Sequence, residues 1–349
     1  MDIGIILLAR TNYPNPTGVE LGAVYRDFID DVIVAEQEYG FDFVNTTEHH
    51  FASDAWSPSQ LPILAHIAGR TSTIELGTEV FLMPFHNPLR VAEDVATVDI
   101  LSNGRFTSFI SGSGSVRDEF DSYNIDPAER WGRLFESLEI IRRCFSEESF
   151  DHQGKYFRFP DVRITTKPVQ DPFPLWVGGF GPKLIERAGR EAYHLQTFGG
   201  PHLVNYLDAL RANGHNPDDF NQQTFSMGHV SDTTDKAWDE AEIAFHYWQN
   251  FYRGRDWIAF ENQTIPELPP VGEFRNHPEF GAVMPVGSPD DVLRKLEPLL
   301  KGSRMTHYAF GFRGAGMQTP IVRHSMELFA REVMPTLRTW GRAPVDKKR

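Results

Sequence analysis

Residues 74–110, IELGTEVFLMPFHNPLRVAEDVATVDILSNGRFTSFI, contain one complete structural unit. The apolar run at residues 74–83 has the length of a buried strand. Apolar residues then recur at helical spacing over residues 89–101, and Asn103-Gly104 ends this helix. Residues 106–110 predict the next strand. A strand, a helix and a second strand in this order predict two parallel strands joined by a helical crossover.

The same alternation continues through the chain. Strand-like runs lie at residues 3–9, 41–47, 74–83, 106–110, 174–179, 193–198, 224–230 and 306–312. Helical patterns lie at residues 24–35, 58–70, 89–101, 131–145, 183–192, 202–213, 234–251 and 325–337, and a capped helix begins at Ser288-Pro289. Eight strands and at least eight helices favour a (β/α)8 TIM barrel over a doubly wound sheet. Without an internal repeat or a linker, we expect a single domain over residues 1–349.

One segment does not follow this alternation. Residues 253–285 contain five prolines and little hydrophobic periodicity. A stretch of this length without regular structure is uncommon inside a compact domain. We therefore interpret residues 253–285 as a long excursion before the eighth strand and as a candidate lid, rather than as part of the core. A shorter β excursion is expected at residues 155–166.

The composition excludes several classes of protein. The 349 residues include 34 basic and 48 acidic side chains, and the net charge of −14 would repel the phosphates of nucleic acids and anionic membranes. The single cysteine, Cys144, excludes a disulfide framework and a zinc site built from several cysteines. The apolar stretch at residues 3–9 has no basic flank and is too short to span a bilayer. These features predict a cytoplasmic protein without a membrane or nucleic-acid partner.

Most standard catalytic motifs are absent from the sequence, which contains no P-loop, no G-x-S-x-G elbow and no H-E-x-x-H motif. Residues 110–117 resemble a dinucleotide-binding fingerprint, but Arg117 stands in place of its third glycine. This run also follows the fourth strand rather than the first. We therefore do not expect a Rossmann-type nucleotide site.

The most distinctive local feature is Glu48-His49-His50, at the C-terminal end of the second predicted strand. Barrel enzymes place their chemistry at this face. Adjacent residues of an extended chain point to opposite sides, so His49 and His50 cannot both line one pocket. This argues against a metal site and leaves one histidine for acid–base or hydrogen-bonding chemistry. The alternative is a polar strand end whose two histidines only satisfy hydrogen bonds.

A glycine-rich turn, residues 178–183 (GGFGPK), opens a helix directly after the fifth predicted strand. Its exposed amide groups and the helix dipole would hold a phosphate. Arg130, at the start of the fourth helix, would bind the same phosphate through two hydrogen bonds. The alternatives are a plain tight turn and a solvated arginine.

Four groups of residues occur in a characteristic order along the chain. They are Glu48-His49-His50-Phe51 after Tyr39-Gly40-Phe41-Asp42; Leu76-Gly77-Thr78 with Met83-Pro84, Asn87-Pro88-Leu89-Arg90 and Asn103-Gly104-Arg105-Phe106; Pro285-Val286-Gly287-Ser288-Pro289; and Met326-Glu327-Leu328-Phe329 with Val333-Met334-Pro335. In this order they resemble the luciferase-like flavin-dependent monooxygenases, and among these the alpha subunit of bacterial luciferase. The resemblance covers nearly the whole chain and is weakest over residues 253–278.

The resemblance implies a (β/α)8 barrel that binds reduced FMN (FMNH2) at the C-terminal ends of its strands. The flavin would react with O2 at its C4a carbon to give a peroxide that oxidises a small organic substrate, while the protein orients the ring and excludes water. By position, His49 matches the family's catalytic histidine and His50 the neighbour that supports the site. The family's non-proline cis peptide would fall at Glu79-Val80, where Glu79 replaces a small residue under the ring. The remaining implied cofactor contacts are Ser111 and Gly112 at the ring edge, and Gly178, Gly179, Phe180, Gly181 and Arg130 around the phosphate.

The resemblance also bears on partners. Since the chain has no second nucleotide-binding motif, we expect a two-component enzyme that receives FMNH2 from a separate flavin reductase. One alternative is a deazaflavin-dependent hydride-transfer oxidoreductase on the same fold, and another is a non-catalytic flavin-binding partner subunit. Luciferase relatives pair through helices near the second and third units, which implies a homodimer.

Overall fold

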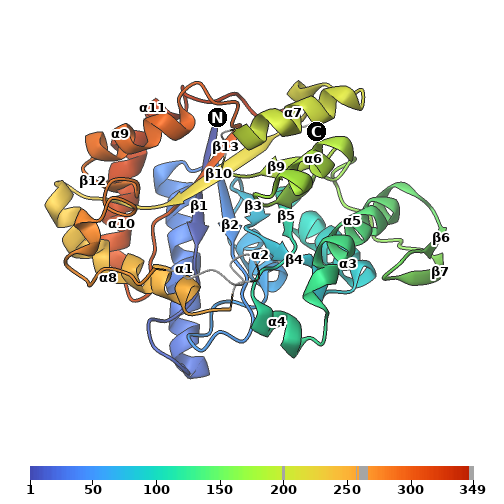
Figure 1. Cartoon of the computed structure of the whole chain (residues 1–349), viewed down its shortest axis with the longest axis horizontal. Coiled ribbons are helices and arrows are strands. Elements are labelled where there is room, and N and C mark those ends of the chain that lie inside the picture. The colour runs from blue at the N-terminus through green and yellow to red at the C-terminus, as the bar shows by residue number, and fades with distance from the viewer. Residues whose placement is uncertain (199–200, 257, 259–265, 346–349) are drawn as a thin grey trace.

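Parallel strands close into a barrel in the computed structural model, which describes residues 1–198, 201–256, 258 and 266–345 (Figure 1). The barrel strands are β1 (Asp2–Leu7), β2 (Phe43–Thr46), β3 (Glu75–Thr78), β5 (Phe106–Gly112), β8 (Leu175–Gly178), β9 (His194–Gln196), β10 (Gln222–Met227) and β13 (His307–Gly311). They pair in the order β3-β2-β1-β13-β10-β9-β8-β5, and a further pairing of β3 with β5 closes the ring. The (β/α)8 barrel expected from the sequence is confirmed.

Helices surround the barrel, as Figure 1 shows from blue α1 to red α10. They are α1 (Gly18–Val34), α2 (Gln60–Ala68), α3 (Pro88–Leu101), α4 (Arg117–Ser122), α5 (Arg130–Ser146), α6 (Pro182–Arg190), α7 (Pro201–Ala212), α8 (Thr234–Arg253), α9 (Pro289–Leu300), α10 (Thr319–Leu328) and α11 (Met334–Leu337). Each crossover leaves the carboxyl end of a strand. The loops and helix starts that follow the strands therefore gather at one end of the barrel, which we call the mouth.

Local sequence signals determine where two of these helices begin. At the start of α1, the Thr17 hydroxyl accepts the N–H of Glu20, and the Glu20 carboxylate accepts the N–H of Thr17. This reciprocal capping box satisfies two amides that the helix itself leaves free. At α9, Ser288 Oγ accepts the N–H of Asp291 at 3.3 Å, which confirms the capped start expected at Ser288-Pro289.

Large side chains fill the barrel at the end opposite the mouth. The ring of His307 lies 5.4 Å from the ring of Phe43 and 5.4 Å from the ring of Trp176. Gly4 makes room for this packing, because a Cβ there would overlap the Phe43 ring. The three ring-bearing side chains are buried. This end of the barrel is a packed core, so a ligand site is expected at the mouth.

The third predicted strand is divided. Strand β3 ends at Thr78, the peptide bond between Glu79 and Val80 is cis, and the short strand β4 (Phe81–Leu82) continues beside β5. A single strand over residues 74–83 was therefore too long, because residues 79 and 80 leave the β3 ladder. The cis bond lies where the resemblance implies it.

The C-terminal helix also differs from its prediction. It was expected over residues 325–337, but α10 begins at Thr319, with Pro320 in its first turn. A π-helical turn, Phe329–Val333, then separates α10 from α11. Proline at a helix start is the signal for the earlier beginning. The change to π-helical geometry has no comparable signal in the apolar spacing.

Part of the long excursion packs into the core. Phe274 and Phe280 are buried, and their rings stack with centroids 4.4 Å apart. The interpretation of this segment as lying outside the core is therefore wrong for Phe274, Phe280 and Met284, while most of residues 266–285 are exposed or half-buried. The burial of these three side chains was hidden because they lie in turns without a regular period. Residues 257 and 259–265 lie outside the described residues, and movement as a lid stays a prediction.

Two small sheets lie outside the barrel. The expected β excursion is an antiparallel hairpin of β6 (Phe150–Gln153) and β7 (Arg158–Val162), which projects beside α5 in Figure 1. Strands β11 (His229–Val230) and β12 (Val286–Gly287) form a separate parallel pair. Within the described ranges, no helix combines the length and apolarity needed to cross a membrane.

Candidate active site

The side chains singled out by the sequence lie at the carboxyl ends of four neighbouring barrel strands. His49 and His50 follow β2, Glu79 and Val80 follow β3, Ser111 and Gly112 end β5, and Gly178 ends β8. These four strands are consecutive in the barrel. Because all of them point the same way, the fold gathers residues that are distant in sequence at the mouth.

Val80 fills a notch between two of the predicted cofactor residues. A Cβ on Gly112 would overlap Cγ2 of Val80, and a Cβ on Gly178 would lie 2.5 Å from its Cγ1. Side chains do not approach so closely, so both strand ends need glycine while Val80 occupies the notch. The structure thus brings Val80, Gly112 and Gly178 together.

We expect Gly112→Ala to destabilise the protein by about 1–3 kcal/mol, because it overfills this notch. Removing the opposing methyl groups in the double variant Gly112→Ala/Val80→Ala should restore part of the loss. Urea denaturation of both variants measures the effect. Gly18→Ala is the matched control, since a Cβ at this exposed helix start meets nothing within 4 Å. Equal stabilities of Gly112→Ala and Gly18→Ala would show that Val80 does not pack closely against Gly112.

His49 is held between a carboxylate and a phenol. Its Nδ1 lies 3.0 Å from Oε1 of Glu119, and its Nε2 lies 3.4 Å from the hydroxyl oxygen of Tyr252. Trp56 and Phe251 pack edge-on against the imidazole, with centroids 4.6 Å and 5.4 Å away. His49 is only 9% exposed, and burial raises the pKa of Tyr252, which keeps its hydroxyl neutral. The site therefore presents one oriented imidazole in a mostly apolar environment.

Glu119 was missed by the sequence analysis. It lies on α4, a short helix that was not predicted, just after the stretch of residues 110–117 that was compared with a glycine fingerprint. Its Oε1 accepts the N–H of His50 at 2.9 Å and lies 3.7 Å from Nη2 of Arg255. One buried carboxylate oxygen thus holds the backbone of one histidine and the side chain of the other. The sequence does not reveal which of the adjacent residues Asp118 and Glu119 turns inward.

His50 contacts a different set of partners from His49, as expected for neighbours on an extended chain. Its Nε2 lies 2.7 Å from Oε1 of Glu48, and its Nδ1 lies 3.1 Å from the hydroxyl of Tyr123. The same Glu48 oxygen lies 3.1 Å from Nε2 of His86. One ligand atom from each of Glu48, His50 and His86 falls within 4.8 Å of the others, as in a metal site. Since both histidine nitrogens already hydrogen-bond to the same Glu48 oxygen, we assign no metal here.

Glu48 connects this histidine cluster to the cis peptide. Its Oε2 accepts a hydrogen bond from Nε2 of Gln60 at 2.8 Å, and the same amide donates to the carbonyl of Val80 at 3.0 Å. Burial alone would raise the pKa of Glu48, but hydrogen bonds from His50 and His86 hold this pKa at about 2. Glu48 is therefore an ionised acceptor at neutral pH. Gln60 was also missed, because a lone polar residue at a helix start carries no functional signal.

The glycine turn and Arg130 begin two neighbouring helices at the mouth. Gly181 is the N-cap of α6, and it offers no side-chain cap to the amides of the first turn. Such free amides suit an anion. Arg130 begins α5 and donates from Nη1 to the carbonyl of Pro127 at 2.8 Å. The structure places both features at the same end of the barrel, although the described hydrogen bond of Arg130 goes to Pro127 rather than to the turn.

Phe180 lies in the same turn with its ring at the surface. The ring is 46% exposed and stacks on Phe198 at 4.2 Å, with only 10° between the two planes. The side chain therefore belongs to an aromatic pair that joins the loops after β8 and β9. Any phosphate contact at Phe180, and at the neighbouring Gly179, would come from the backbone.

The residues at the mouth fit a flavin. Several buried polar atoms there have no hydrogen-bond partner in the described structure: Glu79 Oε1, Ser111 Oγ, Gln196 Nε2 and Gln223 Oε1. Gln196 and Gln223 stand opposite each other on the paired strands β9 and β10. A flat heterocycle uses an apolar support such as Val80 together with a few polar atoms at its edges. The uncapped start of α6 suits the phosphate of the same ligand.

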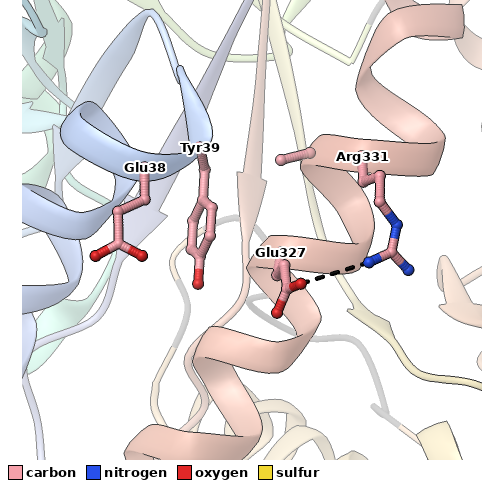
Figure 2. Close-up of a pocket in the computed structure, with 5 residues that line it drawn as sticks. Glu38, Tyr39, Glu327 and Arg331 are labelled. Atoms are coloured by element: carbon pink, nitrogen blue, oxygen red, sulfur yellow. Dashed lines mark hydrogen bonds and ion pairs between the residues drawn. The ribbon is translucent and has the colours of Figure 1, made fainter.

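A cavity of about 500 Å³ elsewhere on the molecule is not part of this site (Figure 2). It is lined by Glu38, Tyr39, Glu327, Ala330 and Arg331. The Glu327 carboxylate and the Arg331 guanidinium lie 3.4 Å apart at its edge. These residues belong to outer helical segments rather than to strand ends, so the cavity has no connection with the residues at the mouth.

Comparison with known proteins shows the family to which this sequence is similar. The family described as luciferase-like monooxygenase matches residues 1–307. The chain is 30% identical over 192 residues to an F420-dependent glucose-6-phosphate dehydrogenase of Amycolatopsis mediterranei, an alignment that covers 53% of this chain and 57% of that protein. It is 24% identical over 298 residues to limonene 1,2-monooxygenase of Rhodococcus erythropolis, which covers 82% of this chain and 75% of that protein. For several curated relatives the matched segment spans about half of their length.

Solved structures share the whole fold. Monooxygenase RslO1 from Streptomyces bottropensis superposes with a TM-score of 0.80 at 23% identity, over 96% of this chain and 99% of that chain. The oxygenating constituent of 3,6-diketocamphane monooxygenase from Pseudomonas putida, in complex with FMN, superposes with a TM-score of 0.75 at 18% identity, over 99% of both chains. The match to the family extends over most of the sequence, and the fold agrees with it. The chain belongs to the luciferase-like monooxygenase family of oxidoreductases.

Proposed function

We propose that this protein is a two-component FMN-dependent monooxygenase, which uses FMNH2 and O2 to oxidise a small organic substrate. The observation that supports this function best is the enclosure of His49 at the mouth. Its imidazole lies between the Glu119 carboxylate and the Tyr252 hydroxyl, with aromatic rings packed around it. An oriented acid–base group from which water is excluded suits oxidation chemistry in which water must not compete with the substrate.

The roles of the remaining residues follow from their positions. Bound FMNH2 would supply the electrons that activate O2. Val80, in its notch between Gly112 and Gly178, would support the ring, and the start of α6 would bind the phosphate together with Arg130. His49 would hold or transfer a proton at Nε2, because its Nδ1 is engaged by Glu119. His50 would act through Glu48 as a positioning residue.

Anaerobic titration with FMNH2, followed by rapid mixing with O2, tests this proposal. We expect saturable binding and a delayed return of oxidised FMN, because the enclosed site slows the loss of the activated oxygen to water. Immediate reoxidation at the rate of free FMNH2, or no binding, would contradict a monooxygenase. The proposed separate reductase is tested in parallel, since the protein with FMN alone should not accelerate the oxidation of NADH.

A deazaflavin-dependent dehydrogenase is the second candidate, and the similarity to an F420-dependent glucose-6-phosphate dehydrogenase favours it. In that reaction His49 would take a proton from an alcohol, and a bound deazaflavin would supply the hydride acceptor. This enzyme would bind F420 more tightly than FMN and would consume no O2. Titrating the same preparation with both cofactors therefore separates the two candidates. A homodimer remains our proposal for the assembly, and sedimentation measures it.

A further inference from the structure

Glu79 has an unusual environment at the mouth of the barrel. Its Oε2 accepts two hydrogen bonds, one from Nδ2 of Asn45 at 2.9 Å and one from Nε2 of Gln223. Its other oxygen, Oε1, is buried and has no hydrogen-bond partner among the described residues. The two carboxyl oxygens are therefore not equivalent. Oε2 accepts hydrogen bonds from two side chains of the protein, whereas Oε1 lacks a protein partner and would bond to a ligand.

The orientation of Asn45 is fixed by a further contact. Ser108 Oγ donates to Oδ1 of Asn45 at 3.2 Å, so the amide nitrogen of Asn45 is the atom that faces Glu79. Gly77 makes this contact possible, because a Cβ there would overlap both Ser108 Oγ and Asn45 Oδ1. The donor on β2 is thus held in place from β3 and β5. An amide held in this way cannot rotate to accept a proton from Glu79.

This arrangement determines where a proton on Glu79 would lie. An oxygen that accepts two N–H groups acts as the carbonyl oxygen of a carboxylic acid, and the proton resides on the other oxygen. Burial raises the pKa of Glu79 to about 8, although the hydrogen bonds from Asn45 and Gln223 oppose this. No charged group contributes to this shift among the described residues. Glu79 is therefore mostly a neutral acid at pH 7, with its hydroxyl at Oε1.

We propose that Glu79 donates a hydrogen bond from Oε1 to the ring of the bound flavin and thereby stabilises the reduced, anionic ring. This inference rests on the flavin site proposed above, where the ring would lie beside the Glu79-Val80 peptide. The unpartnered Oε1 is the donor, and the carbonyl groups and deprotonated nitrogen of the reduced ring are acceptors of the matching chemistry. Glu79 acts as a positioning and electrostatic residue, and it forms no covalent bond.

The sign of the pH dependence follows directly. Neutral Glu79 attracts the anionic ring, whereas ionised Glu79 repels it, so affinity for FMNH2 should fall as pH rises. With a pKa of about 8 and binding only to the neutral form, affinity falls about tenfold between pH 7 and pH 9. Gln223 on β10, Asn45 on β2 and Ser108 on β5 do not titrate. The titratable residues of the neighbouring strands are Glu48 and His49 beyond β2, Glu75 on β3, His194 on β9, and His307 and Tyr308 on β13.

The first test uses the ligand-free protein and does not depend on any cofactor. Infrared spectra of the wild type at pH 7 and pH 9 should show the carbonyl band of a protonated carboxyl that disappears at the higher pH. Glu79→Gln keeps the shape and one oxygen that can accept both hydrogen bonds, with an N–H donor in place of the Oε1 hydroxyl, but it cannot ionise, so its spectrum should lack this band. The exposed Glu186→Gln should retain it. Absence of the band in the wild type would overturn the proposed neutral acid.

The second test measures affinity for FMNH2 and the reduction potential of bound FMN at pH 7, 8 and 9. The wild type should lose about tenfold in affinity over this range, while the affinity of Glu79→Gln should be nearly independent of pH. Because reduction of FMN itself takes up a proton, the potential should fall with pH in both proteins, but more steeply in the wild type. Circular dichroism of the variant controls for its fold. Binding with the same pH dependence in both proteins would overturn this inference alone. No FMN binding by a protein that shows the carboxyl band would instead overturn the flavin site itself.

Discussion

His49→Ala is expected to abolish nearly all productive use of oxygen by the FMN-loaded protein, while the fold and the affinity for FMNH2 remain close to those of the wild type. His49 is the imidazole that the structure encloses at the mouth, oriented through its Nδ1 by Glu119. A positioned general acid or base typically contributes about 10²–10⁴-fold to a rate. We therefore expect productive oxidation to fall by at least about 10²-fold. The delay before oxidised FMN returns, after mixing with O2, should also shorten, because the imidazole no longer fills the enclosed site and water can enter it.

The matched control for this experiment is His66→Ala, which removes an exposed histidine on α2. Its delay and FMNH2 affinity should equal those of the wild type. If His49→Ala also leaves the delay unchanged, His49 is not catalytic, and the interpretation of this chain as a non-catalytic flavin-binding subunit gains support. A large loss of FMNH2 affinity in His49→Ala would instead assign the histidine to binding.

Glu48→Ala is expected to have the largest effect on stability. The ionised Glu48 carboxylate accepts hydrogen bonds from His50, His86 and Gln60. Glu48, His50 and Gln60 are buried, and the His86 side chain is 29% exposed. Removing a buried charged partner typically costs about 3–5 kcal/mol, because the groups around it lose their acceptor. Urea denaturation should show a loss of this size. Glu48→Gln retains one acceptor oxygen and should lose less.

Glu186→Ala serves as the control. The Glu186 side chain is exposed on α6, so its removal should change the free energy of unfolding by less than about 0.5 kcal/mol.

A second expected consequence of Glu48→Ala concerns the hydrogen bonds of Gln60 at the site. Gln60 would lose one of its two acceptors, and its remaining bond to the Val80 carbonyl would no longer be fixed. Equal stability of Glu48→Ala and Glu186→Ala would show that the histidine cluster holds together without its carboxylate.

The barrel itself was predictable because each strand is buried on both faces. Buried parallel strands appear as continuous apolar runs, and glycine or proline marks their ends. The errors lie where this rule does not apply. Residues 79 and 80 lie inside a largely apolar run that predicts one strand, yet their cis peptide divides it. Phe274 and Phe280 belong to the core, but they lie in turns that have no period.

The site was predictable only in part, for a different reason. His49 and His50 could be placed because they follow a recognisable strand, and the cis peptide because a resemblance marked its position. Glu119, Tyr252 and Gln60 come from helices, where the inward-facing residue depends on how the helix packs against its neighbours. Val80 in its notch depends on two glycines from strands that are distant in the sequence. Only the assembled barrel brings these residues together.

The packed end of the barrel has a kinetic consequence. Phe43, Trp176 and His307 fill the interior there, so the mouth is the side from which ligands reach the strand ends. A cofactor that settles against Val80 would then lie beneath any substrate that approaches His49. Arrival and departure would follow a fixed sequence, with the cofactor first to enter and last to leave. Steady-state measurements should therefore show compulsory-order kinetics, in which excess substrate traps the spent cofactor and slows the next cycle.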